Sequence, residues 1–307
     1  MKTVTTSKFD LISHVNQTIL EQFGKIKDGT CNYLIPPNST TPYNPISKSI
    51  YSSMNYFLLN LERHQKDFRY NAWATFNQIK KAGGKVQKNA ISEKVIYYNF
   101  LYFYKNKKIT KEQYQSYRIS LTKKEQLLNL SAKGYMKYYN VFNFYYVDGL
   151  DGLLQEDKQL KLNTANSIHT AEKLVVKNNP RLAFEKINNA YYLPSADKIV
   201  MPQKKFFVST YEYYATLLHE LSHWTGHNSR LNRELGAIGK DLDIYAKEEL
   251  IAELSSAYLL AFCKIQSDFS GAATYIDHWI KAVEKDKKFF FKSMSKAQKA
   301  FDFITTD

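Results

Sequence analysis

The segment that most constrains this chain is residues 211–234, which contains the pentapeptide HELSH. His219 and His223 are four residues apart, and residues at that spacing project from the same face of a helix. Two neutral imidazoles placed side by side can bind one zinc ion at about 2.0–2.1 Å. Glu220 lies about 100° further round the helix, so its carboxylate would miss the metal and act as a general base on a neighbouring water. The spacing therefore predicts a metal-dependent hydrolytic site on a helix.

The residues around HELSH favour this helix. Ser209 and Glu212 have the spacing of a capping box, and Gly226 is typical of the residue at which a helix stops. Apolar residues between them recur at helical spacing, at Tyr214, Leu217, Leu218 and Leu221.

A catalytic zinc site usually has three protein ligands. In the HExxHxxGxxH pattern the third is a histidine, but Ser229 occupies that position here. The alternative is a glutamate from a following helix. The apolar pattern of residues 245–262 predicts such a helix. We expect Glu249 to be the third ligand and Glu253 to orient a ligand histidine. The alternative is that Glu253 itself is the third ligand. Glu248 is expected to be solvated. The expected ion is Zn²⁺, with Mn²⁺ or another divalent metal as the alternative.

The positive charge of the chain is unevenly distributed. Residues 1–165 contain 24 Lys and Arg against 12 Asp and Glu, whereas residues 166–307 contain 19 against 17. The first segment also holds 16 of the 24 tyrosines. Cations bind phosphates and aromatic rings stack on unpaired bases, so this composition predicts binding to single-stranded DNA. A genome rich in Lys and Tyr codons would explain the overall composition but not the asymmetry.

The predicted fold class is α+β, with two domains at residues 1–160 and 161–307. Residues 105–137 are polar and rich in lysine, which predicts a surface insertion or hairpin arm. In the rest of the first domain, helices are expected in the ranges 1–28, 47–63 and 75–81. Aromatic strands are expected in the ranges 95–104 and 138–147. In the second domain, residues 190–202 are expected to form a hairpin just before the HELSH helix.

The sequence favours a cytoplasmic protein without a membrane partner. No apolar stretch approaches the length of about 18–20 residues that crosses a bilayer. Residues 1–14 lack the apolar region of a signal peptide. Cys31 and Cys263 match no metal-binding spacing and do not indicate a disulfide framework.

Three C-terminal segments occur in a specific order: YYLPSADKIVMP, YYATLLHELSHWTGHNSRLNRE and YAKEELIAEL. They resemble the zincin-like metallopeptidase domain of the ArdC-type antirestriction proteins. Upstream, YSSMNYFLL, WATFNQIKKAGGKVQKN and YYNVFNF follow the order of motifs in the single-stranded-DNA-binding domain of that family. Two departures are Ser53, where a glycine is common, and residues 88–91, which replace a K-G-E-K run.

This resemblance implies a DNA-binding N-terminal domain, a peptidase-like C-terminal domain, and a role in protecting plasmid DNA from restriction during conjugation. By position it makes His219, His223 and Glu249 the metal ligands and Glu220 the catalytic carboxylate. The expected DNA contacts are Tyr51, Asn55, Trp73, Lys80, Lys85 and Lys88.

Three functions remain open at this point. The first is a DNA-binding metallopeptidase with an unidentified protein substrate. The second is a DNA-binding shield whose metal stabilises the fold without catalysis. The third is a cytosolic peptidase with no role in nucleic-acid binding.

Overall fold

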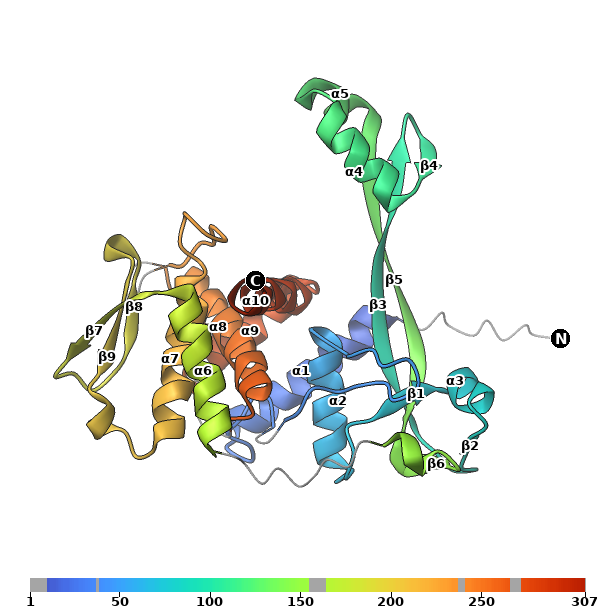
Figure 1. Cartoon of the computed structure of the whole chain (residues 1–307), viewed down its shortest axis with the longest axis horizontal. Coiled ribbons are helices and arrows are strands. Elements are labelled where there is room, and N and C mark those ends of the chain that lie inside the picture. Colours follow the sequence, from blue (N-terminus) through green and yellow to red (C-terminus); the bar gives the residue numbers. More distant parts are fainter. Residues whose placement is uncertain (1–9, 37–38, 155–163, 237–240, 266–271, 307) are drawn as a thin grey trace.

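Helices and strands alternate in the first half of the chain, whereas helices dominate the second half (Figure 1). The computed structural model describes residues 10–36, 39–154, 164–236, 241–265 and 272–306. This arrangement confirms the α+β class. The predicted domain boundary at residue 160 lies outside the described residues. No helix within the described ranges combines the length and apolarity that a bilayer span requires.

The N-terminal part is built around a four-stranded antiparallel sheet in the order β1-β5-β3-β4. Strands β2 and β6 form a separate pair. The elements of the N-terminal part are α1 (Leu11–Lys27), α2 (Met54–Gln65), β1 (Trp73–Thr75), α3 (Phe76–Lys81), β2 (Lys85–Val86), β3 (Ser92–Tyr104), β4 (Lys107–Ile109), α4 (Lys111–Ser120), α5 (Lys123–Asn129), β5 (Leu130–Asn143), the 3-10 turn η1 (Phe144–Tyr146), β6 (Val147–Asp148) and η2 (Asp151–Leu153).

Strands β3 and β5 pair along their whole length, from Ser92 opposite Phe142 to Tyr104 opposite Leu130. Their outer halves leave the body of the protein as a two-stranded ribbon with β4, α4 and α5 at its tip (Figure 1). We call residues 97–139 the arm. The prediction of an arm is confirmed, but its two helices were not predicted. Each begins with a capping box, at Thr110 and at Thr122, which is a signal visible in the sequence.

Helix α2 begins later than the periodicity of residues 47–63 indicates. Its first residue is Met54, because Ser53 adopts φ 54° and ψ −127°, a backbone conformation that a helix cannot contain. The backbone N–H of Ser53 donates a hydrogen bond of 3.0 Å to Oε1 of Gln298 in the last helix. The start of α2 is therefore attached to the C-terminal part of the molecule.

The C-terminal part packs helices against a small sheet. Strand β9 is central in the order β7-β9-β8, parallel to β7 and antiparallel to β8, so residues 190–202 form the predicted hairpin. The elements are α6 (Thr164–Asn178), β7 (Arg181–Glu185), β8 (Tyr191–Leu193), η3 (Pro194–Ala196), β9 (Lys198–Pro202), η4 (Lys204–Phe206), α7 (Thr210–Trp224), α8 (Leu242–Cys263), α9 (Ala272–Lys285) and α10 (Phe289–Thr305).

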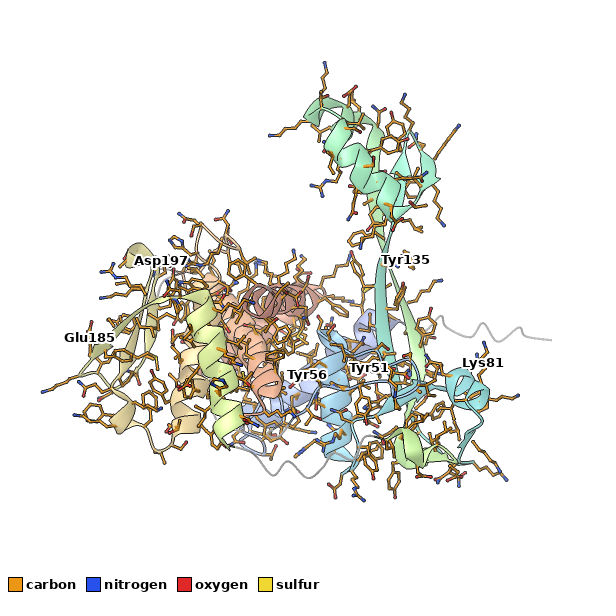
Figure 2. The ribbon with its side chains drawn as sticks, viewed as in Figure 1. Tyr51, Tyr56, Lys81, Tyr135, Glu185 and Asp197 are labelled. Atoms are coloured by element: carbon orange, nitrogen blue, oxygen red, sulfur yellow. The ribbon has the colours of Figure 1, made fainter. Side chains whose placement is uncertain are left out.

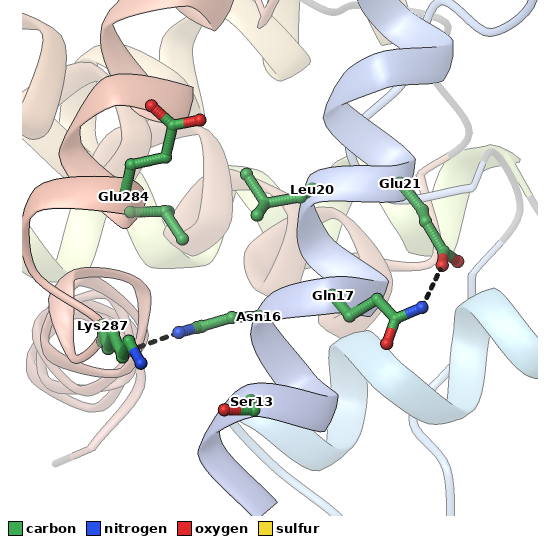
Figure 3. Close-up of a pocket in the computed structure, with 8 residues that line it drawn as sticks. Ser13, Asn16, Gln17, Leu20, Glu21, Glu284 and Lys287 are labelled. Atoms are coloured by element: carbon green, nitrogen blue, oxygen red, sulfur yellow. Dashed lines mark hydrogen bonds between the residues drawn. The ribbon is translucent and has the colours of Figure 1, made fainter.

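Helices from both ends of the chain share one hydrophobic core. Val15 and Phe23 of α1 and Phe57 of α2 belong to the same buried cluster as Leu250 of α8 and Trp279 of α9. A groove of about 490 Å³ remains between α1 and α9, where Asn16 donates a hydrogen bond of 2.9 Å to the backbone oxygen of Lys287 (Figure 3). The cores of the two predicted domains are thus continuous through α1 and α2.

Candidate metal centre

Helix α7 presents the two histidines of HELSH as the spacing predicts. Ser209 is the N-cap residue, and its hydroxyl accepts a hydrogen bond of 3.1 Å from the backbone N–H of Glu212. The helix ends at Trp224, two residues before Gly226. The rings of His219 and His223 lie 4.9 Å apart between centroids, and both side chains are buried.

Helix α8 brings Glu249 to the same point. Its Oε2 lies 3.5 Å from Nε2 of His219, and its Oε1 lies 3.4 Å from Nε2 of His223. The ligand atoms of the three residues all lie within 4.8 Å of one another. Two ligands at about 2.0–2.1 Å from a tetrahedral ion are about 3.3–3.4 Å apart, so these two separations fit a divalent ion bound between the groups.

The electrostatics of the cluster also fit a cation. Burial disfavours the charged form of each group, but their mutual attraction outweighs it. The pKa of the Glu249 carboxyl is lowered by the neighbouring imidazoles, and the pKa of His223 is raised by Glu249 and Glu248. Metal binding requires neutral imidazoles, so a divalent ion can take the place of the protons that these rings hold beside the carboxylate.

Glu248 supports His223 from the other side of its ring. Its Oε1 lies 3.3 Å from Nδ1 of His223, and its side chain is 1% exposed. Arg233 binds both carboxylate oxygens, with Nε 2.9 Å from Oε2 and Nη2 2.6 Å from Oε1. Arg233 also donates to the backbone oxygen of Ser222 and the hydroxyl of Thr225. The expectation that Glu248 is solvated is wrong, because a buried guanidinium neutralises its charge.

Two further side chains lie beside Glu249. Burial, followed by the negative charge of the Glu249 carboxylate, raises the pKa of Tyr245. Tyr245 precedes Glu249 by four residues on one helix, a spacing that could have identified it from the sequence. Glu253 is half-buried one turn further along. Burial lowers the pKa of His219, but Glu249, and Glu253 to a smaller extent, raise it above its ordinary value. The orienting role of Glu253 stays a prediction.

Glu220 is buried directly after His219, with 7% of its surface exposed. Its position in α7 leaves it beside the His219–His223–Glu249 cluster, outside the set of three convergent ligand atoms. Its role as the general base stays a prediction.

The six residues expected to contact DNA are placed unequally. Lys80, Lys85 and Lys88 are exposed on and after α3. Trp73 is 1% exposed, and its indole N–H donates a hydrogen bond of 2.8 Å to Oδ1 of Asn71, so its ring is part of the core. The prediction that Trp73 stacks on DNA is therefore wrong for this conformation, because its faces are covered by the protein.

Tyr51 and Asn55 have structural contacts. The amide of Asn55 makes two hydrogen bonds with the backbone of Ile96, at 2.7 and 2.8 Å, which attach α2 to β3. The hydroxyl of Tyr51 donates to the backbone oxygen of Trp73 at 3.2 Å. Both side chains are half-buried, so a role in DNA binding would have to use their remaining exposed surface.

Comparison with known proteins assigns this geometry to a family. Residues 9–142 match the N-terminal domain of the anti-restriction factor ArdC, and residues 169–296 match a zincin-like metallopeptidase. The metal-free crystal structure of the antirestriction ArdC protein from plasmid R388 is 30% identical, with a TM-score of 0.72 over 96% of this chain and 97% of that one. The chain belongs to the ArdC family of antirestriction proteins.

Two further relatives are informative. A Mn(II)-bound crystal structure of the R388 ArdC protein is similar over the same shares of both chains, with a TM-score of 0.71. A DNA primase TraC of Escherichia coli is 30% identical over 302 residues, which are 94% of this chain and 26% of the primase. The ArdC-like chain thus spans about a quarter of the length of that primase.

Proposed function

We propose that this ArdC-family chain binds single-stranded DNA through its N-terminal domain, holds a divalent metal ion at His219, His223 and Glu249, and protects incoming plasmid DNA from restriction. The observation that carries the proposal is the convergence of these three ligands, with their carboxylate–imidazole separations of 3.4 and 3.5 Å, inside a zincin-like domain. The expected domains are residues 1–160 and 161–307. Zn²⁺ is the proposed ion, and the Mn(II)-bound relative supports Mn²⁺ as the alternative.

The residues present support peptide hydrolysis. A divalent metal at this site would polarise a peptide carbonyl and lower the pKa of water. Glu220 would take a proton from the attacking water and pass it to the leaving amine. His223 is held by Glu248, which Arg233 holds in turn. Strand β8 is an edge strand that packs against α7, so it offers backbone groups to which an extended peptide could add.

DNA binding is supported by charge and exposure. The segment 1–165 holds 24 of the 43 Lys and Arg residues but 12 of the 29 Asp and Glu residues. Lys80, Lys85 and Lys88 are exposed near one another in sequence, where they can pair with phosphates. The expected preference is for single strands over duplex, with little dependence on sequence. Since incoming plasmid DNA is exposed to restriction in the cytoplasm, we expect the protein to act there.

The test of the enzyme proposal is Glu220→Gln in the full chain. The amide keeps the shape of the side chain but cannot accept the proton. We expect metal content, thermal stability and affinity for single-stranded oligonucleotides to stay at wild-type values, while cleavage of an unfolded protein such as casein is lost. Wild-type protein that contains stoichiometric metal but cleaves no protein would contradict the peptidase role.

The same variant tests the relation between catalysis and protection. Conjugation efficiency into a restricting host is measured with wild type, with Glu220→Gln and without the protein. Protection that survives Glu220→Gln would establish the shield, in which the metal centre has no catalytic part. Protection lost with catalysis would show that proteolysis is required.

The metal ligands are tested by elemental analysis of the purified protein. His223→Ala and Glu249→Gln should each lose the bound ion, whereas Glu284→Gln, on α9 and outside the centre, should retain it. An ion bound equally by Glu249→Gln and wild type would show that another side chain completes the site.

A further inference from the structure

The arm carries a groove that is separate from the metal centre. It lies between strand β3 and helix α4 and has a volume of about 240 Å³. Sites for drug-sized molecules usually have about 300–1,000 Å³, so this groove suits one flat ring better than a larger ligand. The side chains that line it and carry the argument are Phe100, Tyr102, Lys111, Tyr114, Gln115 and Arg118.

Helix α4 places two cations at the edges of the groove. Lys111, Tyr114, Gln115 and Arg118 have the spacing i, i+3, i+4 and i+7, so they share the face of α4 that lines the groove. Lys111 and Arg118 are both exposed. Within the described ranges, neither forms a salt bridge with a carboxylate. Their charges are therefore available to an anionic ligand.

Aromatic rings form the wall on the side of β3. The rings of Phe100 and Tyr102 are stacked, with centroids 6.1 Å apart and planes at 30°, and Tyr114 lies 4.7 Å from Tyr102. Phe100 is 40% exposed. An exposed ring next to cations is the combination that binds an unpaired base and its phosphates, because every base has a face that can stack.

The whole arm has the composition that a nucleic acid requires. Residues 97–139 contain nine Lys and Arg residues against two Glu residues, and nine of the 24 tyrosines. Figures 1 and 2 show the arm standing away from the rest of the molecule, with Tyr135 of β5 on its ribbon. A DNA strand can therefore reach it without displacing any other described element.

We propose that this groove is a subsite for one nucleotide of single-stranded DNA. The unpaired base stacks on Phe100 beside Tyr114, and the flanking phosphates pair with Lys111 and Arg118. The inference rests on the proposed function and extends it, because it assigns part of the DNA path to the arm. A duplex would meet the same cations, but its paired bases could not enter the groove.

The test measures the affinity of the full chain for fluorescent oligo(dT) at several salt concentrations. The double variant K111E/R118E is compared with K123E/K124E, which makes the same change of charge on α5 of the same arm, outside the groove. We expect K111E/R118E to weaken binding on the order of tenfold or more, and to reduce the slope of log K against log salt by about 1.4, since each phosphate contact contributes about 0.7 for single strands. The control should change both quantities less.

The outcomes separate this inference from the proposed function. Wild type that does not bind oligo(dT) would overturn the DNA-binding proposal, and the subsite with it. Wild type that binds, together with K111E/R118E that binds equally well, would overturn the subsite alone. Equal losses in both double variants would also overturn it, because the arm would then attract DNA by charge without a groove contact.

Stacking is tested separately at Phe100. Phe100→Leu keeps apolar bulk in the groove but removes the flat ring, whereas Phe100→Tyr keeps the ring. Since each stacked base contributes to the affinity for a single strand, Phe100→Leu should weaken binding on the order of tenfold with an unchanged salt slope, and Phe100→Tyr should bind as wild type does. Photocrosslinking with iodouracil-substituted oligonucleotide should label a peptide from residues 97–104 or 111–120. Labelling confined to other peptides, with normal binding by Phe100→Leu, would exclude the subsite.

Discussion

Oε1 of Glu248 lies 3.3 Å from Nδ1 of His223, while Nε2 of the same imidazole lies 3.4 Å from Oε1 of Glu249. One ring therefore bridges two neighbouring carboxylates of α8. Glu249 faces the position of the ion, and Glu248, held by Arg233, faces the opposite nitrogen. Partners of this kind fix the tautomer and orientation of a ligand histidine.

Glu248→Gln should weaken metal binding about 10- to 100-fold, because an amide orients the ring less firmly than a carboxylate. It should also destabilise the fold by about 3–5 kcal/mol, since the buried guanidinium of Arg233 loses its counter-charge. Metal affinity is measured by competition with a chelator, and stability by denaturant unfolding. Glu253→Gln is the matched control on the same helix. A larger loss of metal from Glu253→Gln than from Glu248→Gln would assign the orienting role to Glu253 instead.

Ser53→Gly should stabilise the protein by about 1–3 kcal/mol, because φ 54° with ψ −127° is a conformation that glycine adopts without strain. The hydrogen bond from the backbone N–H of Ser53 to Gln298 does not involve the side chain and should persist. The midpoint of denaturant unfolding measures the effect. Ser52→Gly provides the control, and it should lower stability because glycine gains freedom in the unfolded chain. A Ser53→Gly protein less stable than wild type would refute the strain.

Trp73→Phe should destabilise the protein by about 1–3 kcal/mol and leave DNA affinity unchanged. Phenylalanine has no N–H, so the buried Oδ1 of Asn71 would lose its donor. Unfolding measurements and oligo(dT) titrations on one preparation separate the two effects. A fall in affinity with stability at the wild-type value would show instead that Trp73 contacts DNA.

Asp197→Asn should reduce stability in a manner that depends on pH. Asp197 pairs with the guanidinium of Arg230 and accepts a hydrogen bond of 2.8 Å from Tyr192, and these contacts, Arg230 first, lower its pKa. A lowered pKa gives stability that is present above the unfolded-state pKa of about 3.9 and is lost as the pH falls through the folded-state value. Asparagine tolerates the left-handed backbone at φ 46°, so the substitution removes charge without adding strain.

This dependence is measured as the difference in unfolding free energy between wild type and Asp197→Asn at a series of pH values. We expect the difference to be largest near neutral pH and to shrink below about pH 4. A difference that stayed constant down to the acid end of the series would show that the charge of Asp197 is not involved.

The metal centre shows what one sequence can and cannot predict. His219 and His223 are brought together by the formation of one helix and by nothing else, so their spacing in the sequence predicts that they share a face. Glu249 follows from helical periodicity in a second apolar segment. Adjacent side chains of a helix point in directions about 100° apart, so Glu248 does not share the surroundings of Glu249. The partner of Glu248 is Arg233, fifteen residues earlier in a connecting segment, and helical periodicity carries no information about that contact.

In the N-terminal part, too, some features can be predicted from the sequence and others cannot. Length, polarity and lysine content predicted the arm, and the capping boxes at Thr110 and Thr122 could have predicted its helices. Trp73 could not be placed, because an aromatic ring beside exposed lysines is equally compatible with a core and with a surface. The late start of α2 depends on the backbone of Ser53, which propensity alone would not have located.

The continuous core of α1, α2, α8 and α9 has a consequence for chimeric proteins. A fusion joined near residue 160 would leave Phe23 and Phe57 without the helices that cover them. An exchange of the segment between the end of α2 and the start of α6 should leave α1 and α2 on the helical body and should keep the residues that pack on Leu59 of α2, which are Phe68, Trp73, Val95 and Val141. Chimeras designed on that plan should express as folded protein, and those cut at residue 160 should aggregate.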